Sequence, residues 1–338
     1  MTPAPCDLTA SAARAEIAAG LLTATALAES CLERIAEREP HLHAFAALDA
    51  DLWLAQAARA DARGCPGPLG GLPVGIKDLA ATRDWPTTCG SPIYAGARLP
   101  FDAAVVSLAR QGGAVIAGKT VTTEFAAFEP GPTRNPHDPM RTPGGSSSGS
   151  AAAVAAGMLP LGVGTQTAGS IVRPAAFCGV VGYKPSFGTV DPTGIKPYAT
   201  SLDTVGVLAR SVADCRLFVA AVSGAPLDPP KAPPVRIGLC RSPAWEGAEP
   251  AMRRAFEQEL PQRLAAAGLA AVALDLPPLY AEAQAAQRVV MAWESARCLA
   301  FEAEMHAGQL SPRLRQALAD GRAVAAADVR EAYACRDA

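Results

Sequence analysis

The sequence lacks several features on which common protein functions depend. Only 5% of its 338 residues are aromatic, and its formal net charge is −2. Nucleic-acid surfaces need basic charge for phosphates and rings for base stacking, and anionic membranes also attract basic charge, so neither partner is expected. Half of the residues are apolar. The chain can therefore bury a large core, and the composition is typical of a soluble metabolic protein.

Cysteine and histidine do not show the spacing of a metal site. The nine cysteines are scattered singly, without a Cys-x-x-Cys pair, and the four histidines include no His-Glu-x-x-His arrangement. An odd number of dispersed cysteines indicates reduced thiols, so we expect a cytoplasmic protein without a bound metal.

Signals for export or membrane insertion are also missing. The first residues, Met1-Thr-Pro-Ala-Pro-Cys-Asp7, contain no basic region followed by an apolar core. No run of about 18 uncharged apolar residues occurs in the sequence. We therefore expect neither a secretory signal nor a membrane span.

Short apolar segments alternate with helical patterns along most of the chain. This alternation predicts an α/β fold with a parallel or mixed sheet between helices. Residues 7–37 indicate two helices, with Thr9 (or Asp7) and Thr23 as caps. Further helices are predicted at 51–63, 102–111 and 150–156, and strands at 73–76, 114–117, 159–165 and 178–183.

The C-terminal third has a different organisation. The Pro-rich segment 224–234 is the strongest candidate for a linker. Beyond it, strands at 235–239 and 271–274 enclose a helix at 250–267 and predict one βαβ unit, and the remainder is helical by pattern.

The segment Gly144-Gly-Ser-Ser-Ser-Gly-Ser-Ala151 has three competing interpretations. A flexible linker should lead into a polar boundary, but this segment runs into an alanine-rich stretch. A phosphate-binding loop of the G-x-x-x-x-G-K-[ST] type needs a lysine that is absent. Ser147 matches the nucleophile of a G-x-S-x-G elbow. That site also needs an acid and then a histidine downstream, and His137 and His306 are the only histidines that could be considered for this role.

Two further segments could carry chemistry. The stretch Gly164-Thr-Gln-Thr-Ala-Gly-Ser170 follows a predicted strand, so its backbone N–H groups could form an oxyanion hole, or Ser170 could simply cap a helix. Lys77 follows the apolar strand 73–76. Most lysines are solvated, but burial disfavours the charged ammonium and can make a lysine a base near neutral pH.

Together these segments resemble the amidase signature family. The matching motifs are Gly-Ile-Lys77-Asp, Gly-Gly-Ser146-Ser and Gly-Ser170-Ile, and the spacing between the two serines is also similar to that of the family. The resemblance covers residues 20–220 well and the rest loosely. Flanking stretches at 86–91, 123–126, 176–185 and 201–206 are similar too.

The resemblance implies a role for each matching residue. Ser170 would be the nucleophile, Ser146 a bridging serine after a cis peptide bond, and Lys77 the general base. No metal or cofactor is implied. Backbone N–H groups would form the oxyanion hole, and neighbouring residues would support the loop; these are Thr167, Ala168 and Gly169 for the hole, and Gly145, Ser147 and Arg173 for support.

Several positions depart from the family pattern. A family Asp-x-Gly-Gly-Ser appears here as Gln166-Thr-Ala168-Gly-Ser170. If position 168 requires a positive φ, Ala168 would cost about 1 kcal/mol. The arginine expected two residues after the nucleophile stands one residue later, as Arg173, and Ser148 replaces a glycine.

Three other polar residues lie beside these motifs. Cys178 lies between Phe177 and a glycine-valine stretch and is interpreted as a small buried residue. Asp78 and Glu124 could lie around the site or could serve as surface or capping groups.

We expect a single amidase domain over residues 1–338, with a catalytic core at 60–220 and a less well defined portion at 235–338. The chain ends within a helical pattern, whereas family members usually continue, so a truncated member is expected. The predicted reaction is hydrolysis of a small-molecule carboxamide to a carboxylate and an amine or ammonia. A partner-dependent amidotransferase subunit or an inactive truncated homologue is the alternative, and a homodimer is compatible with the sequence.

Overall fold

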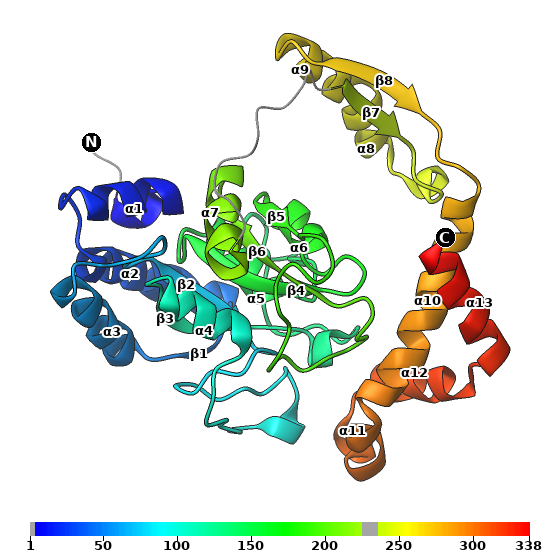
Figure 1. Cartoon of the computed structure of the whole chain (residues 1–338), viewed down its shortest axis with the longest axis horizontal. Coiled ribbons are helices and arrows are strands. Elements are labelled where there is room, and N and C mark those ends of the chain that lie inside the picture. Colours follow the sequence, from blue (N-terminus) through cyan, green and yellow to red (C-terminus); the bar gives the residue numbers. More distant parts are fainter. Residues whose placement is uncertain (1–3, 225–235) are drawn as a thin grey trace. The chain divides into compact units, whose positions relative to one another are not determined.

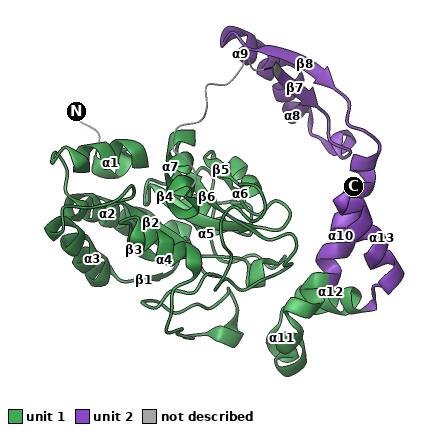
Figure 2. Ribbon diagram, in the orientation of Figure 1, with its two compact units in different colours: residues 1–227, 294–322 green, residues 228–293, 323–338 purple. Residues whose placement is uncertain are grey.

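The computed structural model describes residues 4–224 and 236–338 (Figure 1). All but the first residue of the predicted linker 224–234 lie outside the described residues. The chain forms two compact units, residues 1–227 with 294–322 and residues 228–293 with 323–338 (Figure 2). The single-domain organisation stays a prediction.

Two capped helices begin the first unit. Thr9 and Thr23 are the N-caps of α1 (Ala10–Ala18) and α2 (Ala24–Leu42), and each threonine hydroxyl accepts a backbone N–H of the first turn. A cap of this kind satisfies one of the N–H groups that a helix start leaves unpaired. The prediction of two threonine-capped helices is therefore confirmed, although α2 continues to Leu42.

A six-stranded mixed sheet forms the centre of the first unit, in the order β1-β3-β2-β4-β6-β5. Strand β2 is parallel to β3 and β4, whereas the pairs β1–β3, β4–β6 and β5–β6 are antiparallel. The predicted mixed sheet is confirmed. The strands are β1 (Phe45–Leu48), β2 (Pro73–Lys77), β3 (Val115–Thr120), β4 (Leu161–Gln166), β5 (Val181–Tyr183) and β6 (Thr204–Ala209).

Helices flank this sheet as predicted. Helices α4 and α7 contact each other and the strands, and α5 and α6 form a second contacting pair against the sheet (Figure 1). The helices are α3 (Ala50–Ala62), α4 (Ala104–Gln111), α5 (Ser148–Ala155), α6 (Val172–Cys178) and α7 (Val212–Ser223). Short 3-10 turns occupy Pro5–Asp7, Pro92–Tyr94 and Glu124–Ala126.

The segment 178–183 holds a strand, as predicted, but only in its last three residues. Cys178 is the last residue of α6, and Gly179 ends that helix in the left-handed region with φ +69°. Glycine adopts this conformation without a Cβ penalty and is a common helix terminator. The strand is therefore limited to the three residues of β5.

The register of β2 and β4 positions the polar end of the sheet. Val74, Gly75 and Ile76 pair with Leu161, Gly162 and Val163 in parallel. Because the carboxyl ends of parallel strands meet at one edge, Lys77 at the end of β2 lies next to the residues that end β4. Every residue of β2 is buried, so Lys77 is carried into the protein interior.

The second unit contains the predicted βαβ arrangement. Strands β7 (Arg236–Cys240) and β8 (Ala270–Leu274) pair in parallel. Between them lie α8 (Pro250–Arg254), a π-helical turn (Ala255–Glu259) and α9 (Leu260–Ala266).

The remainder is helical, also as predicted. Helix α10 (Leu279–Cys298) begins in the second unit, α11 (Ala300–Met305) and nearly all of α12 (Pro312–Ala323) belong to the first, and α13 (Ala326–Asp337) belongs to the second. Over the ranges that the structure describes, none of the helices has the length and apolar character needed to cross a bilayer.

Gly149 allows α5 to approach the rest of the first unit closely. A Cβ atom at this position would lie 2.2 Å from the carbonyl oxygen of Ala44 and 2.3 Å from the backbone nitrogen of Val121. Backbone atoms cannot move aside as a flexible side chain can. Only glycine therefore fits at this position in the first turn of α5.

We predict that Gly149→Ala lowers the free energy of unfolding by about 1–3 kcal/mol, because overpacking outweighs the better helix propensity of alanine. Denaturant unfolding of the full chain measures this change. Gly308→Ala is the control, since a Cβ there meets no atom within 4 Å. Equal stabilities of the two variants would contradict the prediction.

Candidate active site

Lys77 is completely buried at the end of β2. Its Nζ atom donates hydrogen bonds to Ser146 Oγ at 2.7 Å and to Thr165 Oγ1 at 2.8 Å. It forms no ion pair with any residue in the described ranges. A lysine in this setting has hydrogen-bond partners but no neutralising carboxylate in contact.

This environment changes the protonation of Lys77. Burial lowers the pKa of Lys77 from its ordinary 10.5 to about 7; the charge of Asp203 opposes this shift and that of Arg173 adds to it. Burial has this effect because the ammonium loses its hydration. A substantial fraction of Lys77 is therefore uncharged near neutral pH and able to accept a proton.

Ser146 follows a cis peptide bond with Gly145, as the family resemblance implied. The carbonyl oxygen of Gly145 accepts two hydrogen bonds from Arg173, one from Nε at 2.9 Å and one from Nη2 at 2.6 Å. The planar guanidinium presents its donors in a fixed fork. Arg173, although one residue later than the family pattern, therefore contacts the peptide group that precedes Ser146.

Ser170 lies in the turn between β4 and α6, and its carbonyl oxygen accepts the N–H of Ser147 at 3.2 Å. The two serine-containing segments are thus adjacent. Ser147 itself is fully buried, and its hydroxyl contacts the backbone of Thr165 at 3.3 Å. Ser147 therefore ties the loop to β4, and its burial argues against the alternative in which it is the nucleophile.

Gln166 shapes the turn that contains Ser170. Its Oε1 accepts the N–H groups of Ile171 at 2.8 Å and Val172 at 3.0 Å, and its Nε2 donates to the carbonyl of Ala168. A neutral amide oxygen thus supports the first turn of α6 where the family has an aspartate.

The turn leaves several donors available. Within the described ranges, the N–H groups of Ala168, Gly169 and Ser170 donate to no protein group, and the Ser170 hydroxyl has no partner. Ala168 does not have a positive φ, so the conformational cost considered from the sequence does not arise. Unpaired N–H groups in such a turn are available as donors for an oxyanion hole.

Asp203 also belongs to the site, although its sequence position alone did not indicate a role. Its Oδ1 accepts the hydroxyl of Thr167 at 2.5 Å, and its Oδ2 accepts the N–H groups of Tyr198 at 2.8 Å and Ala199 at 3.0 Å. Burial raises the pKa of Asp203, against the effect of these hydrogen bonds. The signal in the sequence was its place in the family-like stretch 201–206.

A cavity of about 260 Å³ adjoins these residues. Thr165, Thr167 and Asp203 line one part of it, and Lys196 and Tyr198 line another. Thr165 is shared between the cavity and the hydrogen bond from Lys77, so the two are neighbours. Its size suits a small molecule, although Ser146 and Ser170 do not themselves line it.

The charge of Lys196 at this cavity is neutralised. Its Nζ lies 2.6 Å from Oε1 of Glu302, which also accepts the hydroxyl of Tyr94 at 2.6 Å. Glu302 is completely buried. Asp203, the acidic residue of the cavity lining, has no ion pair within the described residues, in contrast to Lys196.

The remaining candidates from the sequence lie elsewhere. Asp78 forms an ion pair with Lys119 at 3.1 Å, and Glu124 accepts the N–H of Ser311 at 3.2 Å. Cys178 is buried, which raises the pKa of its thiol to about 12, so the thiol is protonated. In the described part of the chain, no cluster of three His, Cys, Asp or Glu side chains could hold a metal ion.

Known proteins are similar to this chain in sequence and in fold. A sequence model of the Amidase family matches residues 26–333. A glutamyl-tRNA(Gln) amidotransferase subunit of Chloroflexus aurantiacus is 43% identical over 276 residues, which are 73% of this chain and 56% of that protein. The chain thus spans little more than half the length of the curated relatives it matches.

Solved structures show the same relationship. A crystallised amidase has a TM-score of 0.89 and 34% identity, covering 98% of this chain and 77% of that one. The native peptide amidase from Stenotrophomonas maltophilia has a TM-score of 0.82 and 30% identity, covering 97% of this chain and 78% of that one. On the match over residues 26–333, this chain belongs to the amidase signature family.

Proposed function

We propose that this chain hydrolyses the C–N bond of a carboxamide to give a carboxylate and an amine or ammonia. The observation that supports this most directly is the 2.7 Å hydrogen bond from buried Lys77 to Ser146. A serine hydroxyl is a weak nucleophile that needs a base within hydrogen-bond reach. Membership of the amidase family supports the same chemistry.

In the first step, Ser170 Oγ attacks the amide carbonyl carbon. As the C–O bond forms, the Ser170 proton passes to Ser146, and the Ser146 proton passes to neutral Lys77. The carbonyl electrons move to oxygen, where negative charge develops. The unpaired N–H groups of the turn, from Thr167 to Ser170, would stabilise this oxyanion as preorganised donors.

In the second step, the tetrahedral intermediate collapses and the C–N bond breaks. Ser146 gives a proton to the leaving nitrogen and regains one from Lys77. The acyl group is then held as an ester on Ser170. A water molecule attacks the ester carbonyl and gives one proton through Ser146 to Lys77. When the bond from the acyl carbon to Ser170 Oγ breaks, this proton returns through Ser146 to Ser170, and the acid product releases its remaining proton to solvent and leaves as the carboxylate, with Lys77 again neutral.

Two further residues would position this machinery. Arg173 holds the carbonyl of Gly145 immediately before Ser146, and its charge favours the neutral form of Lys77. Asp203 holds the side chain of Thr167 at the start of the oxyanion turn. Neither residue exchanges a proton in the proposed steps.

A second candidate function is an ammonia-supplying component of an amidotransferase. The 43% identity to a glutamyl-tRNA(Gln) amidotransferase subunit favours it. The same serines and lysine would then act on an amide donor such as glutamine, and the ammonia would pass to a partner protein. Size-exclusion chromatography of the untagged protein from its host, with an amide-hydrolysis assay on the fractions, distinguishes the two. Co-elution with a partner and little hydrolysis of free amides would favour the amidotransferase component. Turnover of free amides by the chain without a partner would favour the hydrolase.

We predict that Ser170→Ala and Lys77→Ala each lower kcat/KM for the best substrate in a panel of small, aryl and ureido amides by at least about 10³-fold. Covalent labelling by a fluorophosphonate probe should disappear in Ser170→Ala. Ser186→Ala, at an exposed serine, is the control and should retain both. Normal turnover by Ser170→Ala would disprove the proposed nucleophile.

The pH dependence of the reaction should follow Lys77. Because its pKa is lowered to about 7, the neutral base is lost below this pH and fully formed above it. We expect kcat/KM to rise with pH through a limb centred near 7 and then to level off. Lys77→Arg should be inactive at every pH, since guanidinium stays charged. A flat profile in the wild type between pH 5.5 and 8.5 would contradict this assignment.

Arg173→Ala should move that limb. Removing a nearby positive charge raises the pKa of Lys77, so the limb should shift to higher pH while kcat falls about tenfold or more from the lost contact with Gly145. Arg173→Lys retains the charge but not the fork, and should lower kcat with little shift of the limb. An unshifted limb in Arg173→Ala would show that its charge does not act on Lys77.

A further inference from the structure

A second cavity of the first unit has an unusual charge. It has a volume of about 240 Å³ and lies between α3, Arg83, α4 and the start of β3. Four of its eleven lining residues are arginines and none is acidic, in a chain with a net charge of −2. The arginines are Arg59, Arg63, Arg83 and Arg110.

This cavity is separate from the proposed active site. Its lining includes Ala114 and Val115, where β3 begins, whereas Lys77 is the last residue of β2. Strands β2 and β3 are parallel, so these residues lie at opposite ends of the two strands. The two cavities share no lining residue.

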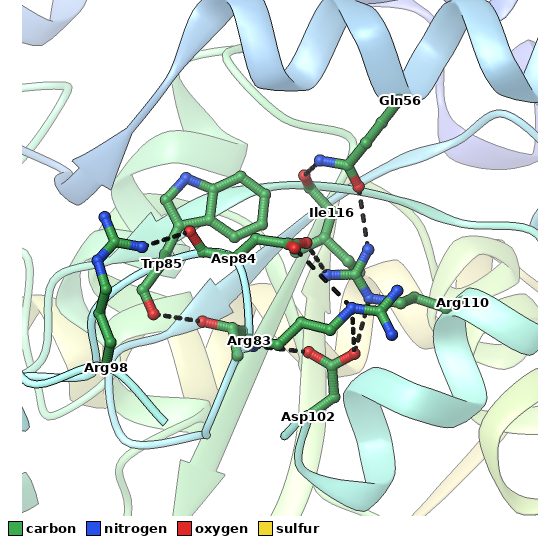
Figure 3. Close-up of polar contacts among 9 residues, drawn as sticks. Gln56, Arg83, Asp84, Trp85, Arg98, Asp102, Arg110 and Ile116 are labelled. Carbon is green, nitrogen blue, oxygen red and sulfur yellow. Dashed lines mark hydrogen bonds and ion pairs between the residues drawn. The ribbon is translucent and has the colours of Figure 1, made fainter. Parts of the chain in front are cut away.

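Two of the four arginines are held by acids that lie outside the lining. Figure 3 shows the guanidinium of Arg110 between Asp84 and Asp102, with Nε 3.0 Å from Asp102 Oδ2 and Nη1 donating to Gln56 at 3.0 Å. The backbone N–H of Arg83 donates to Asp102 at 2.9 Å, and its Nε lies 3.6 Å from the same carboxylate. The charges of these two arginines and two aspartates cancel.

The other two arginines provide an excess of positive charge. Arg59 and Arg63 are exposed, stand one helical turn apart at the end of α3, and form no ion pair with any residue in the described ranges. Like charges at this spacing repel each other, although the carboxyl end of a helix partly compensates. The cavity therefore has two cationic groups without a counter-ion and two more that are already oriented.

We propose that this cavity binds a compact oxyanion carrying at least two negative charges, with phosphate or carboxylate groups. Guanidinium groups bind both kinds of oxygen pairwise through their planar fork. The excess of two charges matches a dianion or a more highly charged ligand. The volume is below the roughly 300–1,000 Å³ typical of sites for drug-sized ligands, which favours a diphosphate or a polycarboxylate over a nucleotide.

Isothermal titration of the full chain with inorganic pyrophosphate and, separately, with citrate tests this proposal. We expect at least one of them to bind at submillimolar concentration, and the tighter of the two identifies the phosphate or the carboxylate class. Arg59→Ala/Arg63→Ala should weaken binding at least about tenfold, as expected for lost charge-assisted hydrogen bonds. Should this variant unfold, Arg59→Gln/Arg63→Gln replaces it.

Arg38→Ala/Arg216→Ala is the matched control, because it removes the same charge from α2 and α7 and neither residue lines the cavity. Its affinity should stay within about twofold of the wild type, since general charge effects are screened at 0.15 M salt. Absence of binding of both anions at millimolar concentration would overturn the proposal. Equal weakening in the two double variants would overturn it as well.

Discussion

The proposed chemistry depends on the burial of a single amine. Lys77 reaches the interior because it is the last residue of a strand whose two neighbours are both parallel to it. Lys77 is fully buried there, and the hydroxyls of Ser146 and Thr165 accept hydrogen bonds from its Nζ without carrying charge. A carboxylate at the same distance would stabilise the ammonium and remove the base. The selection of hydroxyls over acids around this amine is therefore the central constraint of the site.

The surrounding contacts hold the groups of the proposed site in one geometry. Ser147 links the serine loop to β4, Arg173 contacts the peptide before Ser146, and Gln166 orders the start of α6 after Ser170. Each of these bonds joins one sequence segment to another. Positioning of this kind is what lets weak nucleophiles and bases act together, because small displacements of reacting atoms reduce rates strongly.

Much of this could be predicted from the sequence, and the reasons for the rest are physical. Strand ends and glycine-rich turns are local signals, so Lys77, Ser146 and Ser170 were accessible as candidate site residues through spacing and family resemblance. The role of Asp203 was not, because its partner Thr167 lies 36 residues away and only the β4–β6 pairing brings them together. The contact of Arg173 with Gly145 also depends on tertiary structure. Strands β1 and β6 were not predicted, because β1 is a four-residue edge strand and the stretch that leads into β6 was interpreted only through the family resemblance.

The pairing of Asp78 has a consequence for its sequence neighbour. Asp78 directly follows Lys77, yet its carboxylate is directed to Lys119, a second fully buried lysine on the adjacent strand β3. Asp78 also accepts the N–H of Thr88, which fixes this direction. The two buried lysines of this sheet therefore differ in their partners: Lys119 forms an ion pair, whereas Lys77 has hydroxyl partners and no ion pair within the described residues. Asp78 is the only acid within one residue of Lys77, and its ion pair with Lys119 holds its carboxylate away from the proposed proton relay.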